Sequence, residues 1–398
     1  MPPRLGLLQF LNMLMGGGCY LIAVTSFAGW SAAGWSPVAT GGTMMAANLA
    51  YCLFVGVGGR LADSWGRART AITGAAIALG GALLALLGGT ATLAAVGTCI
   101  CFGGSALFFP GNVGLFSDAR ALSAGGVQVP LHVKVARYNL GWSGGNLCGF
   151  LIAFGLSYGA VRLGYAAAAF GFVIIIATLL RWWSLPAQPP AAAGDRADHP
   201  ALLRLIRMGR IGLLLYCLAG MALIALFENT LARTLPATQA HTTATGSLTM
   251  YAFGYFCGFL LLGWWGGWVM RPWRLFALSA VMPIAGAVFL FCGLAQLTSP
   301  IPYAVGGFIL GLAFAAVYTA SIYYSLRLPQ GAARAAALHE TYLGVGSTLG
   351  PLLCGGFLML WSNGIAGLGV YLLLGAGLVL GWQLTQLPAI SRLLRSAP

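Results

Sequence analysis

The amino-acid sequence predicts an all-α membrane protein with twelve transmembrane helices in two pseudo-symmetric six-helix bundles. Three observations lead to this fold class: an apolar composition, a succession of apolar stretches of helix length, and a polar segment between two similar halves. Of the 398 residues, 59% are hydrophobic and only 7% are charged. A chain of this composition cannot bury its apolar side chains in one soluble core, so it must be surrounded by lipid. The 59 glycines suit helices that pack closely in a membrane.

Twelve apolar stretches are each long enough to cross a hydrocarbon layer of ~30 Å, which takes ~20 residues of helix. We expect the spans at about 5–28, 39–61, 70–88, 92–116, 138–160, 163–182, 211–232, 243–265, 275–297, 301–325, 339–360 and 364–387. The first run is of full length and no small-residue cleavage site follows it, so we expect no cleavable signal peptide.

The basic residues predict the orientation of these spans. With both termini in the cytoplasm, every lysine and arginine except Arg162 and Arg233 falls on the cytoplasmic side, as the positive-inside rule requires. We therefore expect a multi-pass protein of the cytoplasmic (inner) membrane with both termini cytoplasmic. The net charge of +14 then serves anionic lipid headgroups. We expect no nucleic-acid partner, because no soluble domain carries a basic patch.

A polar segment divides the chain between the sixth and seventh spans. Residues 184–200 are rich in proline and alanine and predict a flexible linker. The following segment, 201–210, places basic and leucine side chains on opposite faces and predicts a short interfacial helix. We accordingly expect an N-terminal six-helix bundle at 1–184, a cytoplasmic linker with its interfacial helix at 185–210, and a C-terminal six-helix bundle at 211–398.

The two halves show traces of an internal repeat. Segments Gly104–Arg120 and Gly311–Arg327 have the same length and the same first and last residues, and they occupy the fourth and tenth spans. A second, shorter similarity joins the fifth and eleventh spans. Parallel repeats of six helices are the units from which some secondary transporters are built.

The stretch GRLADSWGRAR, Gly59 to Arg69, follows the second span. It resembles the G-x-L-A-D-x-x-G-R-[KR] signature of the major facilitator superfamily, and the twelve spans, the split halves and the central linker extend that resemblance over nearly the whole chain. The resemblance implies a secondary active or facilitative transporter that moves a small organic solute across the cytoplasmic membrane by alternating access. Drug-efflux members carry the same signature, which favours export, although importers share it.

The resemblance also implies a cytoplasmic gate. Asp63 is expected to contact the start of the eleventh span, near His339 and Glu340, and to hold the cytoplasmic side closed. The predicted gating motif is completed by Gly59 for close helix contact, Gly66 for a tight turn, and the basic residues Arg67 and Arg69. The basic residue after Arg67 is displaced by one position, and the fourth span lacks the intramembrane arginine of many proton-driven members, which disfavours proton antiport.

Two rows of small residues repeat every four positions. Gly141, Gly145 and Gly149 lie on the fifth span, and Gly346, Gly350 and Cys354 lie on the eleventh. By resemblance these helices lie between the halves, so we interpret the rows as surfaces on which the halves rock. The alternative is ordinary tight packing within one half.

Polar and aromatic residues inside the spans are candidates for the substrate cavity. An amide without a partner is costly in lipid, so the asparagines must face the interior, where they line a cavity or bridge helices. The aromatic candidates either stack on a solute or fill the core. The full set is Asn12, Asn48, Asn112, Asn139, Trp142, Asn146, Tyr255 and Tyr318.

Two acidic positions are candidates for coupling. Glu228 lies near the outer end of the seventh span, where it binds a proton or a cationic substrate, or is a solvated interfacial glutamate. His339 and Glu340 form a protonatable pair or the polar lip of the cytoplasmic gate, and we favour the gate. Protons are a candidate coupling ion, and a small molecule is the expected substrate.

Other functional classes find little support in the sequence. All nine cysteines lie in predicted spans and suggest small packing residues rather than a disulfide framework or a zinc site. No H-E-x-x-H motif, Walker loop or nucleophile elbow is present, so we expect neither an enzyme nor an ATP-driven pump. We expect no cofactor, no metal and a monomer surrounded by membrane lipids. The alternative function is a non-transporting membrane receptor or assembly scaffold of the same fold.

Overall fold

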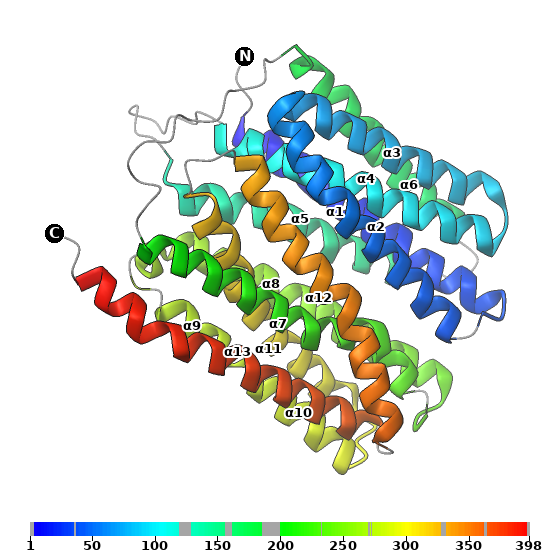
Figure 1. The fold of residues 1–398 in the computed structure, drawn as a ribbon. Coiled ribbons are helices and arrows are strands. Elements are labelled where there is room, and N and C mark those ends of the chain that lie inside the picture. Colours follow the sequence, from blue (N-terminus) through cyan, green and yellow to red (C-terminus); the bar gives the residue numbers. More distant parts are fainter. Residues whose placement is uncertain are drawn as a thin grey trace. The chain divides into compact units, whose positions relative to one another are not determined.

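A computed structural model describes residues 4–35, 37–118, 129–155, 161–184, 200–231, 233–269, 271, 273–327, 332–361 and 364–395. Within these ranges the chain forms helices and no strand (Figure 1). Most of the expected flexible linker, 185–199, lies outside the described residues.

The helices follow one another along the chain with short connections. The first six are α1 (Leu5–Ala32), α2 (Pro37–Ser64), α3 (Arg67–Gly88), α4 (Ala91–Asp118), α5 (Leu131–Gly155) and α6 (Val161–Leu179), which continues as the 3-10 turn η2 (Leu180–Trp182). The remainder are α7 (Pro200–Leu231), α8 (Ala237–Trp264), the 3-10 turn η3 (Gly266–Trp268), α9 (Trp273–Ser279), α10 (Met282–Leu294), α11 (Pro300–Ser325), α12 (Ala332–Leu360) and α13 (Gly364–Arg395).

The prediction of twelve membrane-spanning helices is confirmed. Eleven segments of the described chain are long and apolar enough to cross a membrane, and α9 with α10 makes up one of them, Trp273–Leu294. Helix α5 is the twelfth; it carries Lys134 and Arg137 near its start and several asparagines and glycines, which lower its hydropathy. The ninth span was expected to be continuous but is interrupted after Ser279, because Pro283 stands at the beginning of α10 and supplies no backbone N–H.

Two helix starts differ from the expected ones. The interfacial helix predicted at 201–210 is the first part of α7, which runs unbroken from Pro200. Proline is favoured at a first helical position, and no second proline follows it in α7. Helix α12 begins at Ala332 rather than at 339, because the alanine-rich segment before His339 has a high helix propensity.

The chain separates into two compact units. The N-terminal unit contains Met1–Gly194 together with Ser325–Gly344, and the C-terminal unit contains Asp195–Tyr324 together with Val345–Pro398. The first part of α12 therefore belongs to the N-terminal unit and the remainder to the C-terminal unit.

The glycine row of α5 packs inside the N-terminal unit. A Cβ atom on Gly141 would lie 2.6 Å from the carbonyl oxygen of Gln9, and one on Gly149 would lie 2.8 Å from that of Gly17. Gly145 faces the backbone of the same helix, α1, at Met13. Only glycine permits such close approach of two helix backbones.

The glycine row of α12 packs in the same way inside the C-terminal unit. A Cβ atom on Gly350 would lie 2.6 Å from the carbonyl oxygen of Leu218 on α7, and Gly346 faces Leu214 and Cys217 of that helix. The interpretation of the two rows as rocking surfaces between the halves is therefore wrong, and the alternative of tight packing within each half is confirmed. The pairs α1 with α5 and α7 with α12 are matching contacts of the internal repeat.

Candidate functional site

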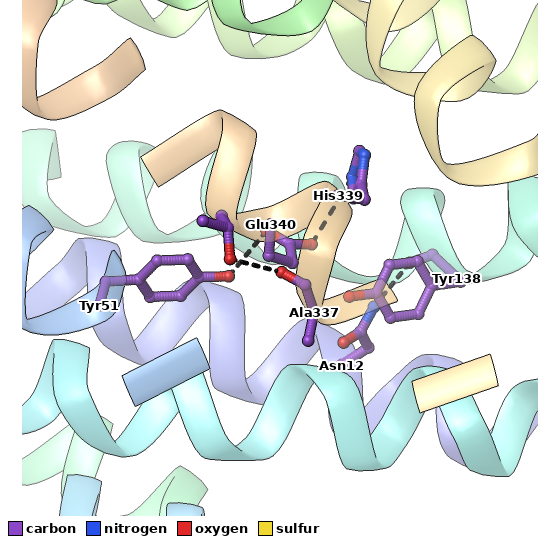
Figure 2. Close-up of polar contacts among 7 residues, drawn as sticks. Asn12, Tyr51, Tyr138, Ala337, His339 and Glu340 are labelled. Carbon is purple, nitrogen blue, oxygen red and sulfur yellow. Dashed lines mark hydrogen bonds and ion pairs between the residues drawn. The ribbon is translucent and has the colours of Figure 1, made fainter. Parts of the chain in front are cut away.

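A buried carboxylate lies in the N-terminal unit. Glu340, on α12, is 3% exposed, and its Oε2 atom accepts a hydrogen bond of 2.8 Å from the hydroxyl of Tyr51 on α2. On its other side Glu340 Oε1 lies 3.8 Å from Nε2 of His339, whose side chain is fully buried. Figure 2 shows the glutamate between the tyrosine and the histidine. We call these three residues the Glu340 site.

The chain around the Glu340 site is apolar and tightly packed. Tyr51 belongs to a buried cluster with Val55 and Ala106, against which Leu343 packs one turn beyond Glu340. A Cβ atom on Gly344 would lie 3.0 Å from the Cβ atom of Cys52, so α2 and the first part of α12 approach closely here. In such surroundings an ionised carboxylate depends on its hydrogen-bond donor, because little water is present to replace it.

The burial of Glu340 and His339 corrects one sequence expectation. These residues were expected to begin the eleventh span as a polar lip. They instead lie within α12, seven and eight residues after its first residue, and both are buried. The alternative that they form a protonatable pair agrees with this position, whereas the gating role of the pair stays a prediction.

Most of the asparagine candidates connect helices of the same unit. Asn12 Nδ2 on α1 donates to the carbonyl of Tyr138 on α5 at 2.6 Å, and Asn112 Nδ2 on α4 donates to Asn12 Oδ1 at 3.3 Å. With its amide nitrogen turned toward α1, Asn146 donates to the carbonyls of Trp142 at 3.0 Å and of Gly16 at 3.2 Å. These bonds join α1, α4 and α5, as the helix-bridging alternative expected.

Three further candidates of this unit differ in burial. Asn139 and Trp142 are buried on α5, whereas Asn48 is half-buried on α2. Their role in a substrate cavity remains a prediction.

The aromatic candidates lie in the C-terminal unit, in a buried cluster of rings. The ring centre of Phe314 on α11 lies 5.7 Å from that of Tyr255 on α8 and 5.4 Å from that of Tyr318. Tyr216 and Tyr251 contact the same phenylalanine at 5.4 and 6.1 Å. This arrangement agrees with the core-filling alternative, because the faces and edges of these rings are used by one another.

Glu228 lies apart from these groups. It is exposed near the end of α7, in the C-terminal unit. Its position fits a solvated glutamate at a helix end, and its role in coupling remains a prediction.

The residues of the predicted gating motif form the turn between α2 and α3. Gly66 has a φ of 117°, a conformation that favours glycine, and it precedes the first residue of α3. The Nη1 atom of Arg67 donates to the carbonyl of Gly114 on α4 at 3.0 Å. Asp63 is half-buried in the last turn of α2, which also contains the buried Gly59.

Arg69 connects this turn with the end of the sixth span. Its Nε atom donates to the carbonyl of Trp183 at 3.1 Å, and its guanidinium lies 5.7 Å from the centre of the Trp183 ring. Both arginines of the motif therefore hold the turn to backbone carbonyls of the N-terminal unit.

Tyr51 is the residue of the site that the sequence did not predict. It stands in the middle of an apolar span and has no charged neighbour in the sequence. A buried carboxylate requires donors, and a tyrosine at mid-span can supply one without carrying a charge. That requirement was the available signal, but it does not say which of the 14 tyrosines would serve.

The arrangement can bind and release a proton. A charged Glu340 accepts the Tyr51 hydrogen bond, whereas a protonated one carries a donor of its own and no longer attracts the phenol as an anion does. Because Tyr51 is on α2 and Glu340 on α12, the charge of this carboxyl group changes the strength of a contact between two helices.

No model of a known protein family matches the sequence, and no curated protein is similar to it. Solved structures nevertheless have a similar fold. FucP, a major facilitator superfamily transporter in the outward conformation, is 16% identical, with a TM-score of 0.63 over 96% of this chain and 99% of its own. A mutant of the peptide transporter POT is 15% identical, with a TM-score of 0.68 over 99% and 97% of the two chains.

The human organic anion transporter MFSD10 is 14% identical, with a TM-score of 0.62 over 99% of this chain and 100% of its own. At these identities the similarity concerns the fold. The chain thus has the twelve-helix major facilitator fold, as the resemblance of the loop after its second span implied.

Proposed function

We propose that this protein is a secondary transporter that moves a small organic solute across a cytoplasmic membrane by alternating access, with Glu340 as its protonatable group. The observation that carries the proposal is the buried carboxylate of Glu340 with its Tyr51 donor, in a fold found in transporters. An ionisable side chain within a membrane span is expensive to bury and usually marks a pathway for ions or substrate.

Protons are the proposed coupling ion. Of the acidic side chains whose burial the structure describes, only that of Glu340 is buried. Protonation removes its charge and weakens its bond to Tyr51, so solute binding and proton binding can act on the same contact between α2 and α12. The printed description of a similar fold, that of an E. coli fucose:proton symporter, supports such coupling by analogy.

The substrate is proposed to be neutral or amphipathic. A strongly charged solute would need buried counter-charges, and the described residues bury few charged side chains besides Glu340 and His339. The loop signature favours export. The distribution of lysine and arginine favours cytoplasmic termini, and the gating motif with Asp63 is proposed to stabilise closure on that side.

A ligand screen tests the proposal. The purified protein is unfolded by heat in detergent with sugars, amino acids, organic acids, nucleosides and lipophilic cations at two pH values. A ligand at 100 times its dissociation constant stabilises the folded state by about 2.7 kcal/mol, which is readily measured. A true substrate should also be moved by the protein reconstituted in liposomes, and a pH gradient should change its flux.

Two variants assign the coupling residue. Glu340→Gln should retain ligand binding and lose its pH dependence, whereas the exposed Glu228→Gln should keep both. The reverse pattern would place coupling at Glu228 and contradict the assignment to Glu340. Absence of any ligand and of any flux across the library would favour the receptor or scaffold alternative.

A further inference from the structure

Three sulfur atoms meet inside the N-terminal unit. The Sγ atom of Cys19 lies 3.8 Å from the Sδ atom of Met15, one turn earlier on α1, and 3.8 Å from the Sγ atom of Cys101 on α4. Both cysteines are free thiols. All three side chains are buried, with exposed fractions of 0% for Met15, 5% for Cys19 and 0% for Cys101.

The spacing of the sulfur atoms matches a three-coordinate site. With metal–sulfur bonds of ~2.3 Å, three ligands in a plane around one ion lie ~4.0 Å from one another. The two observed separations of 3.8 Å are within a few tenths of an ångström of this value. One small ion between the sulfurs would therefore require little movement of either helix.

The chemistry of the ligands selects the ion. Thiolate and thioether sulfur bind soft cations, and together they select Cu(I) rather than Mg²⁺, Ca²⁺ or Mn²⁺. Zinc prefers four ligands, and the described residues contain no group of three or more His, Cys, Asp or Glu side chains that could hold a metal ion. A site of two thiols and one thioether lies outside that pattern.

We propose that Met15, Cys19 and Cys101 form a binding site for one Cu(I) ion. The ion replaces the protons of the two thiols, and these protons pass to solvent, so no electron is transferred. Binding strengthens as the pH rises, because fewer protons then compete for the sulfurs. The ion joins α1 to α4 at a point where the sequence suggested only small packing residues. The proposal is independent of the transported solute.

The test is a titration of the purified, metal-free full chain with Cu(I) under anaerobic conditions, in competition with a chromophoric Cu(I) chelator. The native protein should withdraw one ion per chain from the chelator. Cys19→Ser and Cys101→Ser should each abolish this uptake. Met15→Leu, which keeps the size of the side chain, should weaken it by at least ten-fold, because loss of even an indirect partner of a metal ligand typically costs 10–100-fold.

Cys99→Ser is the matched control. Cys99 is two residues from Cys101 on α4, but its thiol faces the carbonyl of Thr43 on α2 at 3.9 Å. Its replacement should leave Cu(I) uptake unchanged. X-ray absorption at the copper edge should show three sulfur neighbours in the native protein and two in Met15→Leu.

Two results would overturn the proposal. One is uptake in Cys19→Ser or Cys101→Ser equal to that of the native chain, and the other is a copper spectrum without sulfur neighbours. Thermal unfolding of each metal-free variant shows whether it is folded. If a serine variant does not fold, Cys19→Ala and Cys101→Ala, which restore an apolar side chain, give the same comparison.

Discussion

The interiors of the two units are built on similar backbones and filled with different side chains. In each unit a helix with a glycine row packs against the first helix of that unit, α5 on α1 and α12 on α7. The N-terminal unit fills its interior with asparagines, a histidine and a carboxylate. The C-terminal unit places a cluster of aromatic rings around Phe314.

This difference separates what the fold requires from what a function requires. Close helix contact at glycines recurs in both units, so it serves the fold. The buried carboxylate has no counterpart among the described residues of the C-terminal unit, where Glu228 is exposed. A group that costs stability and occurs in only one repeat is better explained by function than by folding. The predictions below test this division, beginning with the largest expected effect.

Phe314→Ala should lower the free energy of unfolding by about 3–5 kcal/mol, because a buried ring in contact with four others leaves a cavity. Molecules that remain folded should transport solute as the native protein does. Phe253→Ala, which truncates a phenylalanine that is 39% exposed on α8, should cost much less. Thermal unfolding in detergent and flux per folded molecule check both. Lost flux with unchanged stability would move a functional role into the C-terminal unit.

Gly145→Ala should destabilise the protein by about 1–3 kcal/mol, because a Cβ atom there would meet the backbone of α1 at Met13. Gly311→Ala should cost as much in the C-terminal unit, where it meets the carbonyl of Tyr251. Gly80→Ala, with open space around it on α3, should be neutral or gain up to about 1 kcal/mol. Equal melting temperatures for all three variants would contradict the shared role of the glycine contacts.

Tyr51→Phe should cost about 1 kcal/mol of stability, the usual contribution of one hydrogen bond. Tyr165→Phe is its matched control, because the Tyr165 hydroxyl lies 3.0 Å from that of Ser26, a neutral partner. Only Tyr51→Phe should also change the pH dependence of solute binding. If the two variants shift the pH profile equally, the Tyr51 bond has no special role.

Asp63→Asn should have the smallest effect on stability. If Asp63 stabilises the closed cytoplasmic side, its charge contributes roughly 0.3–1 kcal/mol at a helix terminus, so alkylation of the half-buried Cys52 should accelerate by up to about five-fold. Labelling of Cys148, on α5, serves as the reference. An unchanged rate at Cys52 would remove Asp63 from the proposed gate.

The sequence was sufficient for the fold because the membrane imposes strong patterns. Apolar runs of helix length predicted the twelve spans, and the loop from Gly59 to Arg69 identified the fold class. The errors concern helix continuity. The first part of α7 was separated because its arginines suggested an interface, and the start of α12 was placed too late because its alanines extend the helix before the apolar run begins.

The candidate site could be predicted only in part. Glu340 and His339 stood out because charged residues are rare in this chain, but their partner did not. Tyr51 is 289 positions away from Glu340, and Cys101 is 82 positions away from Cys19. The glycine rows were visible in the sequence, but nothing in a row states which helix faces it. Contacts between distant parts of the chain depend on tertiary packing, which a single sequence does not record.

The most direct test of the account is an infrared titration of the protein in detergent, which follows the carbonyl stretch of protonated carboxyl groups as the pH is lowered. The native protein should develop a band from a protonated buried carboxyl group. The band should be absent in Glu340→Gln, shifted in Tyr51→Phe and unchanged in Glu228→Gln. A native protein without this band, or the same band in Glu340→Gln, would show that Glu340 does not take up a proton and would contradict its assignment as the coupling group.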